Sequence, residues 1–455
     1  MSDQSDGDNK GLRVFLAIWA GQLLSIFGST ISAFGLTLWA YDKTKQATPL
    51  ALVTLFFMLP MVILSPITGA LVDRFNRKLM MILSDAAAAS MTLMIFIFHS
   101  MDRLEIWHIY LAAFVIGTFQ GLQWPAYSAV ISTMVPKQHF ARTAALIETA
   151  GTMSGIFGPI LAAALIGPLK LRGLLLIDLT TATLAILILL FVHIPQPKTS
   201  EIGASAKNQS VLKDALWGLN YVLKRPSLAA LQTVFTAGNF FWSLAGPISP
   251  AMILARTNQN VTTLGFVNSA GAVGGLLGGL LMGIWGGPKK RVYGVLGGWL
   301  IAGLCNMVFG LGQSLPVWSG ALVLGAIGSS IINGSNQGLW QSKVPPDVQG
   351  RVFGIRRFIA QGVSPIGAAL AGPLADKVFE PAMAQPGLFQ TIFSKLVGTG
   401  PGSGMSLLIL FTGALTVIAV AIGFSLPILR NVDTLIPDFD EVPAHSEGAE
   451  ETTAS

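Results

Sequence analysis

Charged residues are scarce in this sequence. Asp, Glu, Lys and Arg make up only 11% of its 455 residues, whereas 52% are hydrophobic and the mean hydropathy is +0.64. Soluble globular proteins carry about 25% charged residues. Because the deficit extends along the whole chain, it excludes an ordinary soluble globule and indicates a membrane protein that crosses the bilayer many times.

Cysteine is nearly absent, and the motifs of several enzyme classes are missing. Cys305 is the only cysteine, so no disulfide can form within the chain. The five histidines are scattered, and no His-Glu-x-x-His motif or nucleotide-binding motif occurs. We therefore expect no enzyme activity, no cofactor, no metal site and no direct use of ATP. The first apolar run is too long for a cleavable signal peptide.

Long apolar runs make up most of the sequence. A membrane-spanning helix needs about 20 mainly apolar residues. The sequence predicts an all-α fold with twelve spans, and the gap at 195–225 divides them into two six-helix bundles. The predicted spans are 13–40, 48–72, 79–99, 106–132, 142–167, 172–194, 226–254, 261–285, 291–312, 316–341, 351–376 and 404–429.

The basic residues are distributed unevenly between the predicted loops. With the N-terminus inside the cell, 20 of the 28 Lys and Arg residues lie in inner segments and 8 in outer segments. This bias follows the positive-inside rule, so it supports the span count and places both termini in the cytoplasm. It also explains the basic excess without a nucleic-acid partner. The predicted units are a cytoplasmic tail (1–12), a bundle (13–194), a linker (195–225), a second bundle (226–430) and an acidic, disordered cytoplasmic tail (431–455).

Two short segments suggest that the bundles are repeats of one another. "VPKQHFAR" begins at Val135 and "VPPDVQGR" at Val344, and each leads into a predicted span. Two six-span halves related as parallel repeats are a known transporter plan. Between the halves, Leu212, Leu216 and Leu219 fall on one helical face. They predict an amphipathic helix on the cytoplasmic leaflet, and an ordinary linker helix is the alternative.

A compact charged segment, "GALVDRFNRKLMM" at 69–81, separates spans two and three. It resembles the signature of the major facilitator superfamily, in which a glycine precedes Asp-Arg and Arg-Lys in this loop, although Asn76 stands where glycine is usual. The resemblance implies a gate in which the aspartate meets the start of span eleven; the alternative is that these charges only set topology. The gate motif is Gly69, Asp73, Arg74, Arg77 and Lys78, and its expected partners are Arg351, Arg356 and Arg357.

Other segments resemble the macrolide-efflux-like branch of the drug:proton antiporters. They are "ARTAALIETAG…FGPILAA", which contains Gly158 and Pro159 of the antiporter motif, and "FEPAM…GTGPGSGMSLL". The resemblance implies a monomeric, proton-coupled exporter of amphiphilic small molecules in the bacterial inner membrane, working by alternating access. Gly117 stands where many antiporters carry an Arg, so proton coupling through that Arg is unsupported. A transporter of a specific metabolite, siderophore or lipid is one alternative, and a non-transporting sensor is another.

The resemblance also places spans one, four, seven and ten around a central cavity. Polar and aromatic residues recur at helical spacing in each of these spans, and such side chains avoid lipid. Amides and aromatics with few charges suit amphiphilic substrates, whereas hydrogen bonding between helices is the alternative. The candidate cavity residues are Gln22, Ser25, Gln120, Trp124, Tyr127, Asn239, Trp242, Asn333, Asn336, Gln337 and Trp340.

Three acidic residues lie within predicted spans, and intramembrane acids are candidates for function. Glu148 is the preferred proton or cationic-substrate site. Asp85 is expected to pair with the arginines of the gate motif, and Asp178 with Arg172. Span eight also carries glycines at four-residue spacing, which predict close helix packing. These glycines are Gly271, Gly275, Gly279 and Gly283.

Overall fold

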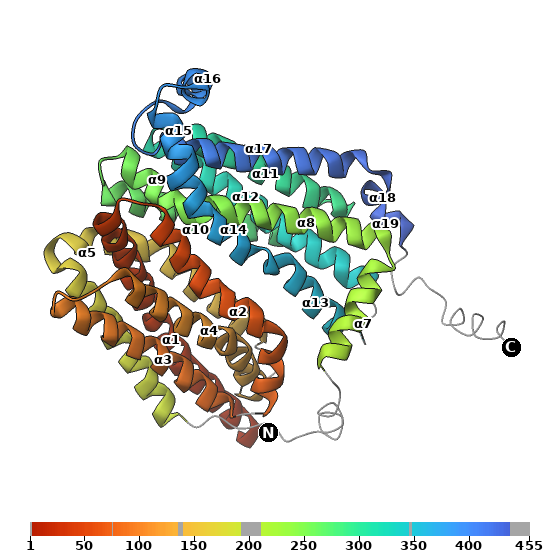
Figure 1. The fold of residues 1–455 in the computed structure, drawn as a ribbon. Helices are drawn as coiled ribbons and strands as arrows, with labels where there is room; N and C mark the ends of the chain where they lie inside the picture. The colour runs from red at the N-terminus through yellow and green to blue at the C-terminus, as the bar shows by residue number, and fades with distance from the viewer. Residues whose placement is uncertain (1, 75, 135–139, 193–210, 345–347, 437–455) are drawn as a thin grey trace.

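The computed structural model describes residues 2–74, 76–134, 140–192, 211–344 and 348–436. Within these ranges every regular element is a helix, as the apolar runs predict (Figure 1). Only the backbone is described for the helical residues 2–13, 65–74, 77, 122, 124–126, 128–133, 140–142, 144–145, 211–215 and 349–351.

The N-half comprises five long helices that supply six spans. They are α1 (Ser2–Thr44), α2 (Thr48–Arg74), α3 (Arg77–Ser100), α4 (Ile106–Met134) and α5 (Phe140–Phe191). The backbone of α5 leaves the helical region at Lys170, where φ is 54° and ψ is −178°. Since this break separates two spans, α5 holds both of those predicted at 142–167 and 172–194.

The C-half supplies the other six spans, two of which are assembled from several short helices. Its helices are α7 (Val211–Leu223), α8 (Pro226–Ala245), η2 (Gly246–Ile248), α9 (Ser249–Arg256), α10 (Val261–Trp285), α11 (Arg291–Leu311), α12 (Leu315–Lys343), α13 (Gln349–Gly362), α14 (Ser364–Leu374), η3 (Ala375–Phe379), α15 (Glu380–Ala384), α16 (Leu388–Val397), α17 (Ser403–Ser425), α18 (Pro427–Arg430) and α19 (Val432–Leu435). Span seven runs through α8, η2 and α9, and span eleven through α13, α14 and η3.

Eight helices of the described chain are long and apolar enough to cross a membrane. One of them is α5, which contains two spans. The apolar stretches Thr48–Leu64 of α2 and Ile106–Gly121 of α4 are shorter, and the series from α8 to α9 provides the last pass. The predicted fold of twelve spans in two bundles is confirmed.

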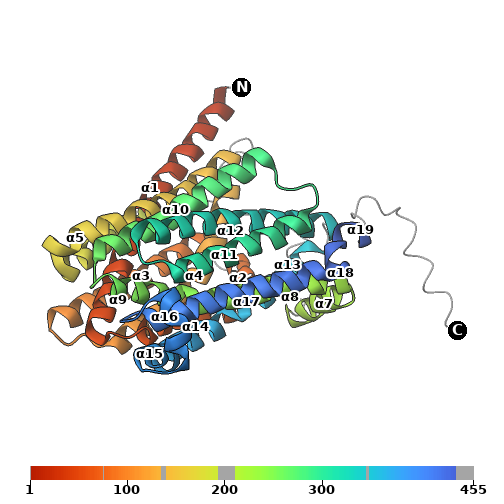
Figure 2. The same ribbon diagram turned by 90° about the horizontal axis from the view of Figure 1, so that it is seen from above.

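The two halves meet at one end of the molecule, which we call the distal end; it holds the turn from α1 to α2. One hydrophobic core there combines Tyr41 and Leu50 of the N-half with Leu254 and Phe309 of the C-half. At the opposite, terminal end, which holds α7 and α19, the described residues form separate cores. Figure 1 shows the halves side by side, with α2 and α13 diverging toward the terminal end, and Figure 2 shows them from above, where they overlap in the view.

The predicted linker helix is present as α7, but its apolar face is divided. Val222 is buried against the C-half core, and Tyr221 packs against the same core. Leu216 and Leu223 remain exposed on the predicted face. One side of α7 therefore packs against the C-half core, and the other side leaves apolar side chains exposed.

The chain continues as two short helices beyond the last span, so the predicted C-terminal tail begins later than expected. Leu429 and Val432 are buried in the C-half core. The Asp433 carboxylate accepts a hydrogen bond from the Val292 backbone N–H (3.2 Å), and its carbonyl accepts one from Lys343 Nζ (2.7 Å). These contacts pin α18 and α19 to the bundle, so the boundary predicted at 431 is wrong; residues 437–455 lie outside the described part.

Candidate functional site

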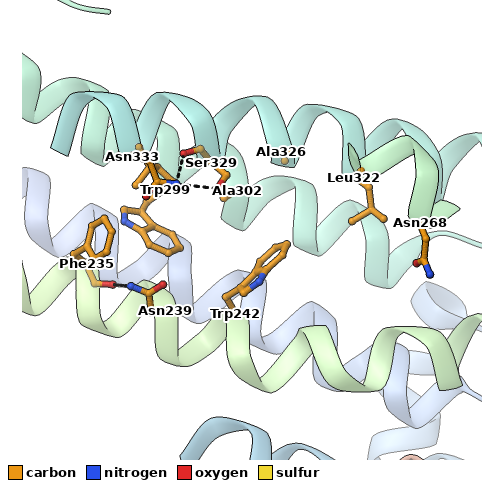
Figure 3. Close-up of a pocket in the computed structure, with 13 residues that line it drawn as sticks. Phe235, Asn239, Trp242, Asn268, Trp299, Ala302, Leu322, Ala326, Ser329 and Asn333 are labelled. Carbon is orange, nitrogen blue, oxygen red and sulfur yellow. Dashed lines mark hydrogen bonds between the residues drawn. The ribbon is translucent and has the colours of Figure 1, made fainter. Parts of the chain in front are cut away.

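A cavity of about 450 Å³ lies within the C-half, lined by side chains of α8, α10, α11 and α12. We call it the C-half cavity (Figure 3). Aromatic rings of Phe235, Trp242 and Trp299 form part of its wall, and Asn239 and Asn333 contribute amides. None of its described lining residues carries a charge. Figure 3 shows the rings of Trp242 and Trp299 directed into the space between their helices.

The polar atoms of this cavity are only partly used within the protein. Asn239 Nδ2 donates to the Phe235 carbonyl and Asn333 Nδ2 to the Ser329 carbonyl, each at 3.0 Å. Their side-chain oxygens can therefore accept from a ligand. The indole Nε1–H of Trp299 is buried without a hydrogen-bond partner in the described chain, although buried polar groups are normally paired. The cavity thus offers flat apolar surface together with a few neutral donors and acceptors.

The sequence-predicted residues of spans seven and ten are only partly brought together. Asn239, Trp242 and Asn333 line the C-half cavity, as expected for cavity residues. Asn336 and Trp340 are instead buried in the bundle. Phe235, Asn268 and Trp299 also line the cavity and were not predicted: Phe235 is apolar, and Asn268 and Trp299 lie on spans eight and nine, outside the four spans expected to surround the cavity.

A second polar site, the amide–carboxylate cluster, lies in the N-half. The two carboxylate oxygens of Asp85 accept hydrogen bonds from Gln22 Nε2 and Gln123 Nε2, both at 2.7 Å. Gln123 Nε2 also lies 3.2 Å from Gln22 Oε1, which closes the cluster between α1, α3 and α4. Asp85 is only 5% exposed. Amides contact both oxygens, whereas the side chains of Arg74 and Arg77 lie outside the described residues, so the expected pairing of Asp85 with these arginines stays a prediction.

The other predicted residues of spans one and four occupy different environments. Ser25 and Tyr127 are buried, and the Tyr127 hydroxyl has no hydrogen-bond partner in the described chain. Gln120 is exposed, whereas the side chain of Trp124 lies outside the described residues. Of these cavity candidates, Gln22 is the only one with a described side chain that joins a defined polar site in the N-half.

Asp178 is held by three hydroxyl groups and not by Arg172. Ser29, Ser32 and Thr92 donate to its carboxylate at 3.0, 2.7 and 2.9 Å. Arg172 donates to the Ser100 carbonyl at 3.0 Å, so the expected ion pair is wrong. With four side chains from α1, α3 and α5 in one cluster, Asp178 ties these helices together.

Glu148 is exposed on α5, and no side chain of the described chain pairs with it. Seven residues make two helical turns, so Glu148 shares a face with Gly155. A Cβ at Gly155 would stand 3.0 Å from the Ala272 Cβ of α10, so this face meets the C-half. Glu148 lies two turns toward the terminal end, where the halves diverge.

The charged loop contributes few described side chains. Lys78 Nζ donates to the carbonyls of Leu190 (2.9 Å) and Val192 (2.7 Å), which anchors α3 to the end of α5. Arg357 is exposed and has no described partner. The side chains of Arg351 and of the remaining gate-motif residues lie outside the described part, so the expected gate contact stays a prediction. The remaining gate-motif residues are Gly69, Asp73, Arg74 and Arg77.

Arg356 is engaged within the C-half. Its guanidinium lies 5.3 Å from the ring centre of Trp340, within the range of a cation–π contact, and Nη2 donates to Gln337 Oε1 at 3.0 Å. The Arg356 carbonyl accepts from Gln232 Nε2 at 3.1 Å. The described contacts of Arg356 therefore join α8, α12 and α13 of one half.

The glycine stripe predicted for span eight does not make the close helix contact. A Cβ added at Gly275, Gly279 or Gly283 would meet nothing within 4 Å, and at Gly271 it would meet only Leu322, at 3.9 Å. The close contact is made one position earlier, at 274 and 278, against α12. The predicted stripe instead faces open space, and Gly271 lines the C-half cavity.

Other glycines set the spacing of neighbouring helices. A Cβ at Gly158 would lie 2.6 Å from Thr30 Cγ2, and the Pro159 carbonyl oxygen lies 2.9 Å from a Cβ built at Gly265. A Cβ at Gly117 would overlap the Phe57 carbonyl of α2. The position at which many antiporters carry Arg is thus a tight contact between α4 and α2, which has no room for a long side chain.

Most of the chain is similar in sequence to known proteins. Residues 18–369 match the Major Facilitator Superfamily. The chain is 27% identical over 370 residues to Macrolide efflux protein A of Streptococcus pyogenes, covering 80% of this chain and 90% of that protein. It is 24% identical over 379 residues to the multidrug efflux pump Tap of Mycolicibacterium fortuitum, covering 78% and 90%.

Solved structures show the same arrangement of helices. The nucleoside transporter NupG superposes with a TM-score of 0.68 at 13% identity, covering 90% of this chain and 98% of that one. An inward-facing, unoccupied bacterial homologue of the human lysosomal transporter Spinster gives a TM-score of 0.66 at 16% identity, covering 92% and 97%. At these identities the match concerns the fold alone.

Proposed function

Because the chain belongs to the major facilitator superfamily, a family of multi-pass membrane transporters, we propose that it exports amphiphilic small molecules by alternating access. The observation that carries this proposal is the likeness to Macrolide efflux protein A over 90% of that protein's length. The C-half cavity supports it, because its aromatic walls and neutral amides suit a large, weakly polar substrate such as a macrolide or a dye.

The sidedness of the proposed cycle follows from the basic residues. If the positive-inside rule holds, the terminal end is cytoplasmic and the distal end is outside. The separate cores at the terminal end and the shared core at the distal end then correspond to an inward-facing state. We place the protein in a bacterial inner membrane as a monomer with both termini in the cytoplasm, and Asp73 with the start of span eleven as the inner gate.

Proton coupling requires a group that can bind and release a proton inside the bundle. Asp85 is the preferred carrier, because no cation pairs with it among the described side chains and its amide partners lie on α1 and α4. Glu148, exposed near the diverging halves, is proposed to attract cationic substrates. Asp178 is proposed to act structurally through its three hydroxyl donors.

The test is transport by the purified protein in liposomes with an acidic lumen. An antiporter would carry a labelled macrolide or a fluorescent dye inward as protons leave, so uptake should exceed that of protein-free liposomes and stop when nigericin collapses the gradient. Uptake that persists without the gradient would contradict proton antiport. Absence of any uptake across a panel of macrolides and dyes would contradict the exporter proposal.

Trp242→Ala is expected to weaken substrate binding without disturbing the fold. Trp242 is 48% exposed and lines the C-half cavity, so its removal takes away contact surface in the cavity and little core packing. Loss of an aromatic contact worth on the order of 1.4 kcal/mol corresponds to about a tenfold weaker apparent affinity. Concentration-dependent uptake in liposomes measures this change, and Trp242→Phe should retain most of the affinity.

Trp285→Ala provides the matched control. Trp285 is similarly exposed, at 53%, but it ends α10 and does not line the cavity. Equal loss of affinity in both alanine variants would remove the C-half cavity as the substrate site.

A further inference from the structure

Asp376 joins the two halves at the distal end through three hydrogen bonds. Its Oδ1 accepts from the Ala47 backbone N–H at 3.0 Å. Its Oδ2 accepts from the Thr48 backbone N–H at 2.7 Å and from the Thr48 hydroxyl at 2.5 Å. Asp376 belongs to η3 at the end of span eleven, whereas Thr48 begins α2 in the N-half. Both carboxylate oxygens are therefore used in a contact between the halves.

The contact matches the chemistry of a helix start. The first backbone N–H groups of a helix have no partner within that helix. A carboxylate satisfies them and is favoured by the positive end of the helix dipole. Here the capping carboxylate comes from the other half of the protein instead of from the preceding turn. The start of α2 consequently has its partner only while the distal ends of the two halves are together.

A glycine one turn before Asp376 permits this close approach. A Cβ built at Gly372 would overlap the Thr48 Cα and stand 3.0 Å from the Thr48 backbone N. The backbone of α14 thus lies directly against the start of α2, which brings Asp376 within reach. Behind this contact, Ala47 and Ala51 of the N-half and Ala371 and Ala375 of the C-half are buried in the shared distal core.

We propose that Asp376 is the outer latch of the transport cycle, a positioning residue that holds the distal end closed in this state. The proposal rests on alternating access as the proposed function. Opening of the distal end separates η3 from α2, so the three hydrogen bonds must break. The inner gate proposed at Asp73 would use the same pair of spans in the opposite sense, with an aspartate of span two facing the start of span eleven.

Removal of the carboxylate should favour the open distal end. Asp376→Asn keeps the size of the side chain but loses the charge and presents an amide donor to backbone donors. Hydrogen bonds to a charged group contribute more than neutral ones, so we expect the ratio of open to closed molecules to rise about tenfold. Thr48→Val removes only the hydroxyl donor and should give a smaller rise in the same direction.

The experiment measures the reactivity of a cysteine placed at Ala51, which is fully buried in the distal core. In a Cys305→Ser background, Ala51→Cys should react slowly with a water-soluble maleimide in nanodiscs while the distal end is closed. Adding Asp376→Asn should raise the labelling rate about tenfold, in proportion to the open population. An unchanged rate in both Asp376→Asn and Thr48→Val would overturn the latch.

Glu380→Gln is the matched control for a merely structural role. Glu380 lies one turn from Asp376 and accepts a hydrogen bond from the Met405 backbone N–H at 2.8 Å, within the C-half. It caps a helix in the same way but does not join the halves, so its variant should leave the labelling rate unchanged. If Glu380→Gln raised the labelling rate as much as Asp376→Asn, the latch would be overturned. A general destabilisation of the distal end would then explain the result in both variants.

The latch and the exporter proposal can fail separately. The labelling rate reports distal opening without any substrate, so a raised rate in Asp376→Asn supports the latch even where the wild-type protein moves no macrolide or dye. Conversely, gradient-driven transport by the wild-type protein together with wild-type labelling of Asp376→Asn supports export and overturns the latch.

Discussion

Asp85→Asn is expected to reduce gradient-driven transport to the level of protein-free liposomes while substrate exchange across the membrane continues. The reason is that Asn preserves the size and most hydrogen bonding of the side chain but cannot release a proton. Asp85 accepts from two glutamines at 2.7 Å, and Asn can keep one such bond through its oxygen. Uptake with an acidic lumen, compared with counterflow of labelled substrate without a gradient, separates the two activities.

Asp178→Asn is the matched control for this prediction. Asp178 is as deeply buried as Asp85, at 4% against 5% exposure, and also accepts several hydrogen bonds. Its three partners are hydroxyls, which can accept as well as donate, so an amide should be accommodated. Gradient-driven transport should therefore survive in Asp178→Asn. Survival in Asp85→Asn and loss in Asp178→Asn would exchange the roles that we assign to the two acids.

Gly274→Ala is expected to destabilise the C-half strongly. A methyl group at this position would lie 2.6 Å from the Val323 Cα and 2.9 Å from its carbonyl carbon, so α10 and α12 must separate. These are backbone atoms, which cannot move aside as a flexible side chain could. Overpacking of this kind typically costs 1–3 kcal/mol, so we expect about 2 kcal/mol and a clear fall in the melting temperature of the detergent-purified protein.

The neighbouring position provides the control. Gly275→Ala adds the same methyl group on the same helix, but nothing lies within 4 Å of it. Its melting temperature should stay close to that of the wild-type protein, and helix propensity even favours alanine over glycine. The pair Gly278→Ala and Gly279→Ala repeats the comparison one turn further along α10. A larger loss at Gly275 or Gly279 would show that the predicted stripe is the packed face after all.

The sequence was sufficient to predict the twelve spans because the bilayer restricts the chain. Every backbone polar group in lipid must be paired within its own segment, so apolar runs of adequate length become helices. The spans are predicted correctly even where their helices are irregular, as at Lys170 in α5 and at η2 in span seven. Length and hydropathy carry this information independently of tertiary packing.

Which face of a helix meets its neighbour could not be predicted in the same way. Along α10 the glycines at 271, 275, 279 and 283 and those at 274 and 278 both show four-residue spacing. Spacing alone cannot say which of the two stripes approaches α12, because that depends on the position of the partner helix. The longer stripe is the stronger pattern in the sequence, but the close contact with α12 is made by the shorter one.

The hydrogen-bond partners of the buried acids could not be predicted for a related reason. Asp85 is 63 residues from Gln22, and Asp178 is 149 residues from Ser29, so no local pattern connects them. No sequence pattern marks Asp376, because two of its three donors are backbone N–H groups of residues 47 and 48. Any residue except proline supplies such a donor, so the sequence holds no signal for this contact.

The most direct test of the account measures both ends of the molecule at once. In a Cys305→Ser background, spin labels at Phe191 and Lys224 report on the terminal end, and labels at Asp102 and Gln385 on the distal end; all four positions are exposed. Double electron–electron resonance in nanodiscs should show, when substrate or pH is changed, that the terminal distance shortens while the distal distance lengthens. Two distances that stay fixed under every condition, or that change in the same direction, would contradict alternating access.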